Sequence, residues 1–116
     1  RVALEWNLAN DPTYGPHTPG GCTQCKGALT IDGNKITRNV SYYIIGQASK
    51  FVTPGSIRIG SNNTTNLTSA AFLTPEGKYV LIVLNESSNT EQFNIRYGDQ
   101  VIGTSLSQGS VGTYVF

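Results

Sequence analysis

The chain has 116 residues, a net charge of +1 and only 13% charged residues. This length fits one domain, or a small domain joined to part of another. The composition excludes the basic stripe expected of a nucleic-acid-binding protein, and no apolar run reaches the roughly 20 residues of a membrane span. The remaining polarity is mostly Asn, Thr, Ser and Gly, which suits strands, turns and neutral ligands such as sugars. Because the sequence has no Met and no visible signal peptide, we expect it to be a piece of a longer protein; a mature protein processed at residue 1 is the alternative.

A strand, a long loop and a small hairpin are predicted near the N-terminus. Residues 2–6 form a short apolar run that predicts a β-strand. The next stretch, 7–35, is crowded with proline and other turn-forming residues, and a loop of this length is usually functional or disordered. Residues 27–37 have β-prone arms around Asp32-Gly33, which predicts a hairpin whose turn could extend by one residue.

The two cysteines lie in this long loop, as Cys22-Thr23-Gln24-Cys25. A zinc site would need another pair of ligands, and His17 is the only histidine, so we expect no metal. A thioredoxin-type redox motif belongs at the start of a helix, whereas the neighbouring glycines indicate a loop. We interpret the pair as a local disulfide that pins the loop and indicates an oxidising compartment; free thiols are the alternative.

One helix is predicted, with its body from Val40 to Phe51. Thr37 or Asn39 can accept hydrogen bonds from the unpaired backbone N–H groups at its start, and a Pro-Gly pair ends it. Apolar side chains recur at steps of three and four residues and form one stripe. In the isolated chain we expect this stripe to be covered by the β-domain or by a second copy of the chain. The stripe consists of Val40, Tyr43, Ile44, Ala48 and Phe51.

Every pattern after residue 56 favours β-strands. In Ser69–Asn85, two apolar runs flank a turn at 74–77 that contains Pro and Gly. The second run is apolar at both parities, which indicates a strand covered on both faces. Strands about every eight to twelve residues, joined by short turns, predict an antiparallel β-sandwich over 52–116. The predicted strands are 57–59, 69–73, 79–84, 90–97, 100–106 and 110–116.

Short motifs along the chain carry a family resemblance. The combination of W-N-L-A at 6–9 with S-K-F-V-T-P-G at 49–55 is specific. Further motifs follow in order at 20–22, 42–43, 83–87, 93–97 and 109–114. Together they resemble glycoside hydrolase family 30, which contains the glucosylceramidases and related bacterial and fungal β-glycosidases. The similarity runs nearly from end to end.

The resemblance implies a (β/α)₈ barrel that carries a side β-domain. Residues 1–51 would be the eighth barrel strand, its long substrate-side loop and its helix, and 52–116 would be most of the β-domain. Barrel enzymes work at the C-terminal ends of their strands, so Trp6 and Asn7 would bind the sugar. The flat face of a Trp can lie on the C–H face of a pyranose, and an Asn offers a donor and an acceptor to hydroxyls.

The resemblance assigns no catalytic residue to this chain. Members of the family are retaining enzymes, with an acid/base Glu after the fourth strand and a nucleophile Glu on the seventh. Both positions lie before Arg1, and retention needs the two carboxyl groups about 5–5.5 Å apart. Glu5 fills neither position, and Asp11 is interpreted as a loop-forming residue that binds its own backbone. We therefore expect the chain alone to be inactive, and the family to need no cofactor.

Two functions remain open. The first is the C-terminal piece of a secreted or periplasmic retaining β-glycosidase that acts on β-linked glucosides or related glycans. The second is a non-catalytic carbohydrate-binding or structural β-sandwich that presents Tyr79, Tyr97 or Tyr114 to a polysaccharide. Aromatic residues at strand spacing are more often core residues, which favours the first. The first also predicts that the isolated chain self-associates through its helix face.

Overall fold

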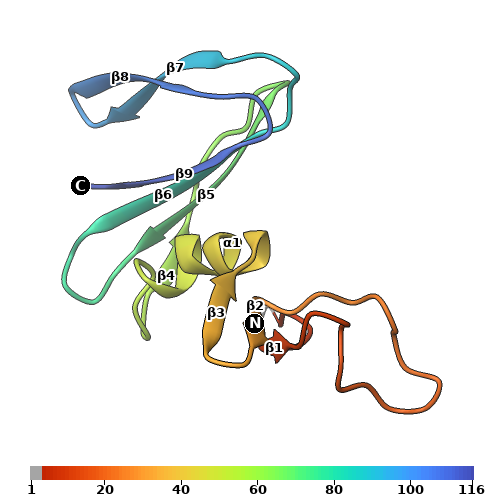
Figure 1. The fold of residues 1–116 in the computed structure, drawn as a ribbon. Helices are drawn as coiled ribbons and strands as arrows, with labels where there is room; N and C mark the ends of the chain where they lie inside the picture. Colours follow the sequence, from red (N-terminus) through yellow and green to blue (C-terminus); the bar gives the residue numbers. More distant parts are fainter. Residues whose placement is uncertain (1–3) are drawn as a thin grey trace. The chain divides into compact units, whose positions relative to one another are not determined.

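The computed structural model describes residues 4–116, which form two compact units divided between Gly46 and Gln47. Helix α1 (Val40–Ser49) runs from the first unit into the second. The regular structure is mainly β, as predicted, and α1 is the one helix among the described residues (Figure 1). The predicted boundary between 51 and 52 stays a prediction.

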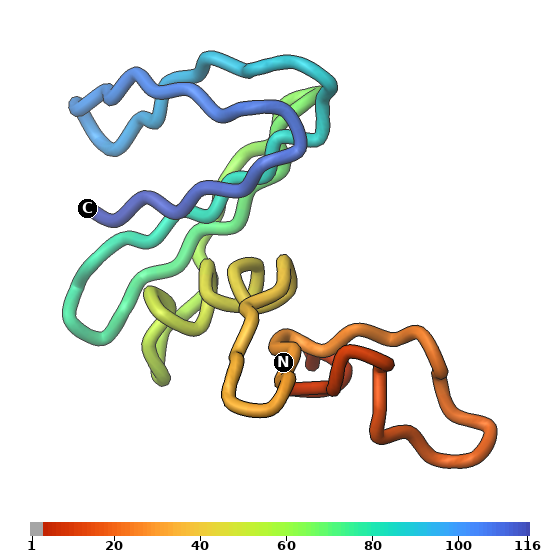
Figure 2. The backbone as a smooth tube through the Cα atoms, viewed as in Figure 1, coloured from red at the N-terminus to blue at the C-terminus, as the bar shows by residue number. Residues whose placement is uncertain are grey.

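The N-terminal unit contains a three-stranded sheet in the order β1–β2–β3. Strand β1 (Ala9–Asn10) is parallel to β2 (Leu29–Asp32), which is antiparallel to β3 (Lys35–Arg38). The β2–β3 hairpin confirms the one predicted from the sequence, and Gly33 in its turn has a φ of 56° that favours glycine. Figure 2 shows the segment between β1 and β2, in orange, leaving the two strands as one long loop and returning to them.

The strand predicted at 2–6 is wrong where the structure describes it. Residues 4–6 have no strand conformation, and Val2 and Ala3 lie outside the described residues. A β-strand exists only where its backbone groups pair with a neighbour, and residues 4–6 pair with no strand within 4–116. The pairing begins three residues later, at Ala9.

Helix α1 starts at the predicted residue and ends two residues before Phe51. None of its residues is buried: Tyr43 is 57% and Ile44 55% exposed. Coverage of the apolar stripe, by the β-domain or by a second copy of the chain, stays a prediction.

The C-terminal unit is an antiparallel β-sandwich, as predicted. One sheet has the order β4 (Ile57–Ile59), β5 (Leu67–Leu73), β6 (Tyr79–Asn85) and β9 (Val111–Val115). The other sheet pairs β7 (Glu91–Tyr97) with β8 (Gln100–Leu106). Figure 1 shows this second sheet as a separate layer facing the first.

Strand β6 is central in its sheet, hydrogen-bonded to β5 on one side and to β9 on the other. Val80 and Val83 have opposite strand parity and are only 1% and 3% exposed, so both faces are covered at the middle of the strand. The 74–77 turn that precedes β6 closes with a bond from the Gly77 N–H to the Thr74 carbonyl (2.9 Å). Gly77 follows the two central residues of the turn and has a positive φ (80°), the conformation that favours glycine at this place in a hairpin loop.

Candidate functional site

A cavity of about 480 Å³ lies in the N-terminal unit, bordered by the residues before β1 and by the long loop. It brings together all four site residues predicted from the sequence, and it adds others that the sequence did not single out. The lining residues that matter for its chemistry are Trp6, Asn7, Asn10, Tyr14, His17 and the Cys22–Cys25 pair.

Trp6 and Asn7 differ in how free their side chains are. Trp6 is 74% exposed, so its ring is available to a ligand. Asn7 has a φ of 66°, and its Oδ1 accepts a hydrogen bond from the Ala9 N–H (3.2 Å). One lone pair of the Asn7 oxygen is therefore used in a local turn, and the amide Nδ2 is a donor that can bind a hydroxyl.

Asn10 is the buried polar residue at the base of the loop, with 4% of its surface exposed. Its Oδ1 accepts a hydrogen bond from the Gly27 N–H, and its Nδ2 donates to the Tyr14 carbonyl (3.0 Å). Asn39 binds the same glycine through its next peptide group, because the Asn39 Nδ2 donates to the Gly27 carbonyl (2.8 Å). Asn10 thus fastens the start of the loop to its end.

Asp11 organises the first turn of the loop, as its interpretation as a loop-forming residue predicted. Its Oδ1 accepts from the Thr13 N–H, the Thr13 hydroxyl and the Gly15 N–H, each at 2.8 Å. These bonds, the Thr13 hydroxyl first, hold the pKa of the Asp11 carboxyl below its usual value of 3.8. Tyr14 lies inside this turn with a φ of 68°.

Cys22 and Cys25 form a disulfide in the structure and line the cavity. The bond joins residues three apart, so it closes only a small ring. Its effect is therefore on the local course of the loop, next to the cavity.

Asn10 and Tyr14 were missed by sequence reasoning. Asn10 is one Asn in a sequence rich in Asn, and its burial depends on the return of the chain at Gly27. Tyr14 stands between turn-forming residues, and only the backbone conformation distinguishes it. A possible signal for both was the spacing of Asp11, Thr13 and Gly15, which is typical of a side-chain-stabilised turn.

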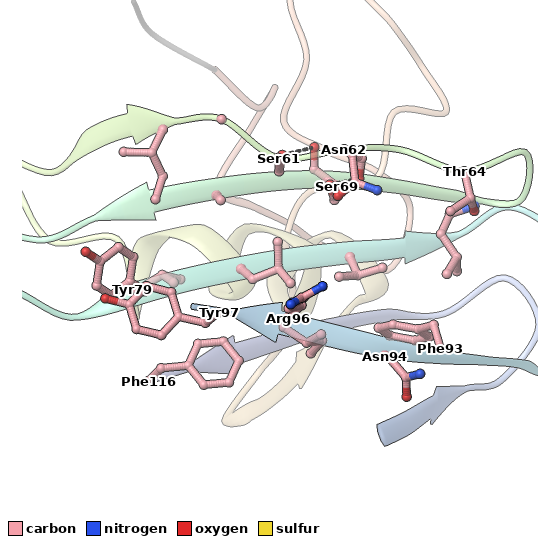
Figure 3. Close-up of a pocket in the computed structure, with 18 residues that line it drawn as sticks. Ser61, Asn62, Thr64, Ser69, Tyr79, Phe93, Asn94, Arg96, Tyr97 and Phe116 are labelled. Atoms are coloured by element: carbon pink, nitrogen blue, oxygen red, sulfur yellow. Dashed lines mark hydrogen bonds between the residues drawn. The ribbon is translucent and has the colours of Figure 1, made fainter. Parts of the chain in front are cut away.

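A second cavity, of about 230 Å³, lies in the C-terminal unit between strands of the two sheets (Figure 3). The Tyr79 and Tyr97 rings meet at one end of it, with centroids 4.3 Å apart, near Phe116. A hydrogen bond with Tyr79, and then desolvation, raise the pKa of the Tyr97 hydroxyl. The Tyr114 ring lies edge-on to Phe93 (6.0 Å). All three tyrosines proposed for a polysaccharide surface are therefore engaged with other rings.

The described residues offer neither a metal centre nor a pair of catalytic carboxylates at the first cavity. No group of three or more His, Cys, Asp or Glu residues in 4–116 could hold a metal ion. Glu5 is exposed and does not line the cavity, and the Asp11 carboxylate is occupied by its own turn. What the cavity offers is an aromatic ring, amide groups and a disulfide wall. No helix within the described residues is long and apolar enough to cross a bilayer.

Comparison with known proteins gives consistent relatives. Residues 55–114 match the glycosyl hydrolase family 30 beta sandwich domain. The endo-1,6-beta-D-glucanase neg1 of Aspergillus fumigatus is 34% identical over 119 residues, which cover 95% of this chain and 24% of that enzyme. The lysosomal acid glucosylceramidase of Mus musculus is 30% identical over 115 residues, which cover 97% of this chain and 22% of that enzyme.

Solved structures agree with the sequence relatives. The endo-beta1,6-glucanase BT3312 superposes with a TM-score of 0.83 at 31% identity, over 95% of this chain and 25% of its own. SrfJ from Salmonella typhimurium superposes with a TM-score of 0.87 at 27% identity, over 96% of this chain and 25% of its own. The chain thus spans about a quarter of the length of its relatives. It belongs to glycoside hydrolase family 30, and it is the C-terminal part of such a protein, with the family's β-sandwich domain.

Proposed function

We propose that this chain forms one wall of the sugar-binding site in a retaining β-glycosidase that acts on β-linked glucosides or related glycans. The observation that carries the proposal is the exposed Trp6 ring on a cavity that also holds Asn7 and the Cys22–Cys25 disulfide. An aromatic face beside a few polar groups is the usual composition of a ligand pocket. The relatives support the substrate class, because they include an endo-1,6-beta-D-glucanase and a glucosylceramidase.

The roles within the enzyme follow from the family. The acid/base and nucleophile carboxylates belong to positions before Arg1, and they act on a glycosidic bond held partly by this chain. Trp6 stacks on a sugar ring, and the Asn7 Nδ2 donates to a hydroxyl. Residues 4–116 alone bind sugar weakly and do not hydrolyse it, since they hold no pair of carboxylates at the cavity.

The site of action proposed for the enzyme is outside the cytoplasm, in a secreted or periplasmic location. The Cys22–Cys25 disulfide supports this, because such bonds persist in oxidising compartments. Self-association of the isolated chain through the exposed face of α1 is part of the same proposal. Light scattering of the isolated chain tests it, and a monomer at high concentration would contradict it.

The experiment for the main proposal compares the whole enzyme with the 116-residue chain. Pustulan, a β-1,6-glucan, and an aryl β-glucoside serve as substrates. We expect hydrolysis with retention by the whole enzyme and none by the chain. Replacing Trp6 by Ala should raise KM about tenfold, the loss of roughly 1.4 kcal/mol of binding. A whole enzyme that cleaves neither substrate, or a Trp6→Ala variant with unchanged KM and kcat, would refute the proposal.

The alternative, a sugar-binding surface on the β-sandwich, has less support. Tyr79 and Tyr97 contact each other, and Tyr114 contacts Phe93. These contacts occupy part of each ring, although Tyr97 remains 45% exposed. Binding of the isolated chain to insoluble glucan that is lost in a Tyr97→Ala variant, and kept in Trp6→Ala, would reverse this preference.

A further inference from the structure

The loop that borders the N-terminal cavity contains a residue in an unfavourable backbone conformation. Among the described residues other than glycine, only Asn7 and Tyr14 have a positive φ, at 66° and 68°. Asn tolerates this left-handed region, but a bulky side chain such as Tyr is an outlier there. Both residues line the same cavity. Strained conformations cluster at ligand-binding sites, so the conformation of Tyr14 indicates a role for its ring at this cavity.

The strained conformation is held by hydrogen bonds on both sides of Tyr14. Its N–H donates to the Asp11 carbonyl (3.1 Å), and its carbonyl accepts from the Asn10 Nδ2 (3.0 Å). Asn10 is 4% exposed and is fastened at its other end to the Gly27 N–H. The backbone of Tyr14 is therefore fixed to the sheet, although its ring is 37% exposed.

We propose that Tyr14 is a second sugar-binding residue, which Asn10 and Asp11 position at the cavity that Trp6 lines. Its ligand is a glucose unit of a β-linked glucan, so the inference rests on the function proposed above. A Tyr suits this role because its ring has an apolar face for the C–H groups of a pyranose and a hydroxyl for the sugar's polar edge. His17 and Thr18 add polar groups to the lining of the same cavity. A glycine at position 14 would remove the strain but also the ring.

A Tyr14→Gly variant tests the proposal, because it removes the strained φ and the sugar-binding ring together and so should affect stability and binding in opposite directions. In the whole enzyme, Tyr14→Gly should raise KM for pustulan about tenfold with kcat changed less than about twofold, because the lost contact is a binding contact. It should leave the melting temperature unchanged or raise it, since glycine adopts a positive φ freely. Tyr14→Phe keeps the ring face, so its KM should stay within about threefold of the wild type. Calorimetric titration with a β-1,6-linked glucotriose should give the same order of affinities.

The matched control is Tyr42→Ala. Tyr42 is 39% exposed, close to the value for Tyr14, but it lies on α1 and does not line the cavity. Its loss should not change KM or the dissociation constant.

Unchanged KM and dissociation constant in Tyr14→Gly, with turnover of pustulan by the wild type, would overturn this inference alone. A wild type that binds the glucotriose but hydrolyses no β-glucoside would overturn the proposed function alone, and a wild type that does neither would overturn both.

Discussion

The backbone N–H of Gly27 donates to the side-chain oxygen of Asn10, seventeen residues before it in the chain. This bond joins the two ends of the long loop where the chain re-enters the sheet. At the next residue, the Ala28 N–H donates to the Asn7 carbonyl (3.2 Å). The contact leaves no room for a side chain at position 27. A Cβ placed there would lie 2.7 Å from the Asn10 Oδ1 and 3.0 Å from the Ala9 backbone nitrogen. Glycine is required here by packing.

We expect Gly27→Ala to destabilise the N-terminal unit by about 1–3 kcal/mol, the usual cost of overpacking a filled site. Native-state hydrogen exchange at the Ala28 and Leu29 amides, which are bonded to the backbone before β1, measures the loss directly. Gly60→Ala is the matched control, because no atom lies within 4 Å of a Cβ at Gly60. Equal exchange rates in the two variants would contradict the prediction.

The fold was predictable where its signals are local. The apolar run of β6 and the Pro-Gly turn before it are visible in the sequence, and the structure has them at Tyr79–Asn85 and 74–77. The strand predicted at 2–6 is absent from its described part, 4–6, because strand formation depends on a partner and no residue pattern shows whether one is present. The apolar composition indicates β-propensity, but residues 4–6 have no neighbouring strand to pair with in the described part of the chain.

The site was predictable only in part. The resemblance pointed to Trp6 and Asn7, and the C-x-x-C spacing pointed to the loop. Tyr14 could not be found this way, because its distinguishing property is a backbone angle imposed by hydrogen bonds from Asn10 and to Asp11. Such angles follow from closure of the whole loop, and the identity of a single residue does not reveal them.

A buried amide should matter most for the stability of the β-sandwich. Asn85 is fully buried, and its Nδ2 donates to the carbonyls of Asn89 (2.8 Å), Leu106 (3.0 Å) and Ser107 (3.0 Å). Replacing Asn85 by Ala removes one donor from each carbonyl. The Asn89 and Ser107 carbonyls keep bonds from the Ser87 and Ser110 hydroxyls, so we expect a cost of about 1–3 kcal/mol, mainly from the buried bond to Leu106. Urea unfolding should show the loss, while KM for pustulan stays unchanged. The exposed Asn94, changed to Ala, is the control and should lose less than about 0.5 kcal/mol. An Asn85→Ala protein as stable as the control would contradict the prediction.

The Cys22–Cys25 disulfide should act on the cavity more than on global stability. A cross-link between residues three apart closes a small loop, so by chain entropy it contributes only about 2 kcal/mol. It nevertheless fixes one wall of the cavity. In the double variant Cys22→Ser/Cys25→Ser, we expect KM for pustulan to rise roughly three- to tenfold. Without the disulfide, substrate binding has to order this wall of the cavity, and that ordering costs binding free energy. Reducing the wild type with dithiothreitol should reproduce this increase and leave the variant unaffected. Unchanged KM after complete reduction would count against the prediction.

The turn around Asp11 should respond to acid in a defined pH range. The hydrogen bonds from Thr13 and Gly15 favour the carboxylate, with a smaller contribution from His17, so the pKa of folded Asp11 lies below 3.8. A depressed pKa means that the stabilisation is fully present above the unfolded value and is lost as pH falls through the folded one. The turn should therefore be unaffected between pH 5 and 8 and should loosen only in stronger acid.

The Thr13 and Gly15 amide signals of selectively ¹⁵N-labelled protein report this, and both should shift with one midpoint below 3.8. In Asp11→Asn, which keeps an oxygen acceptor but has no charge, the pH-dependent shift of the amide signals should disappear. A wild-type midpoint at or above 3.8 would show that the hydrogen bonds do not favour the carboxylate.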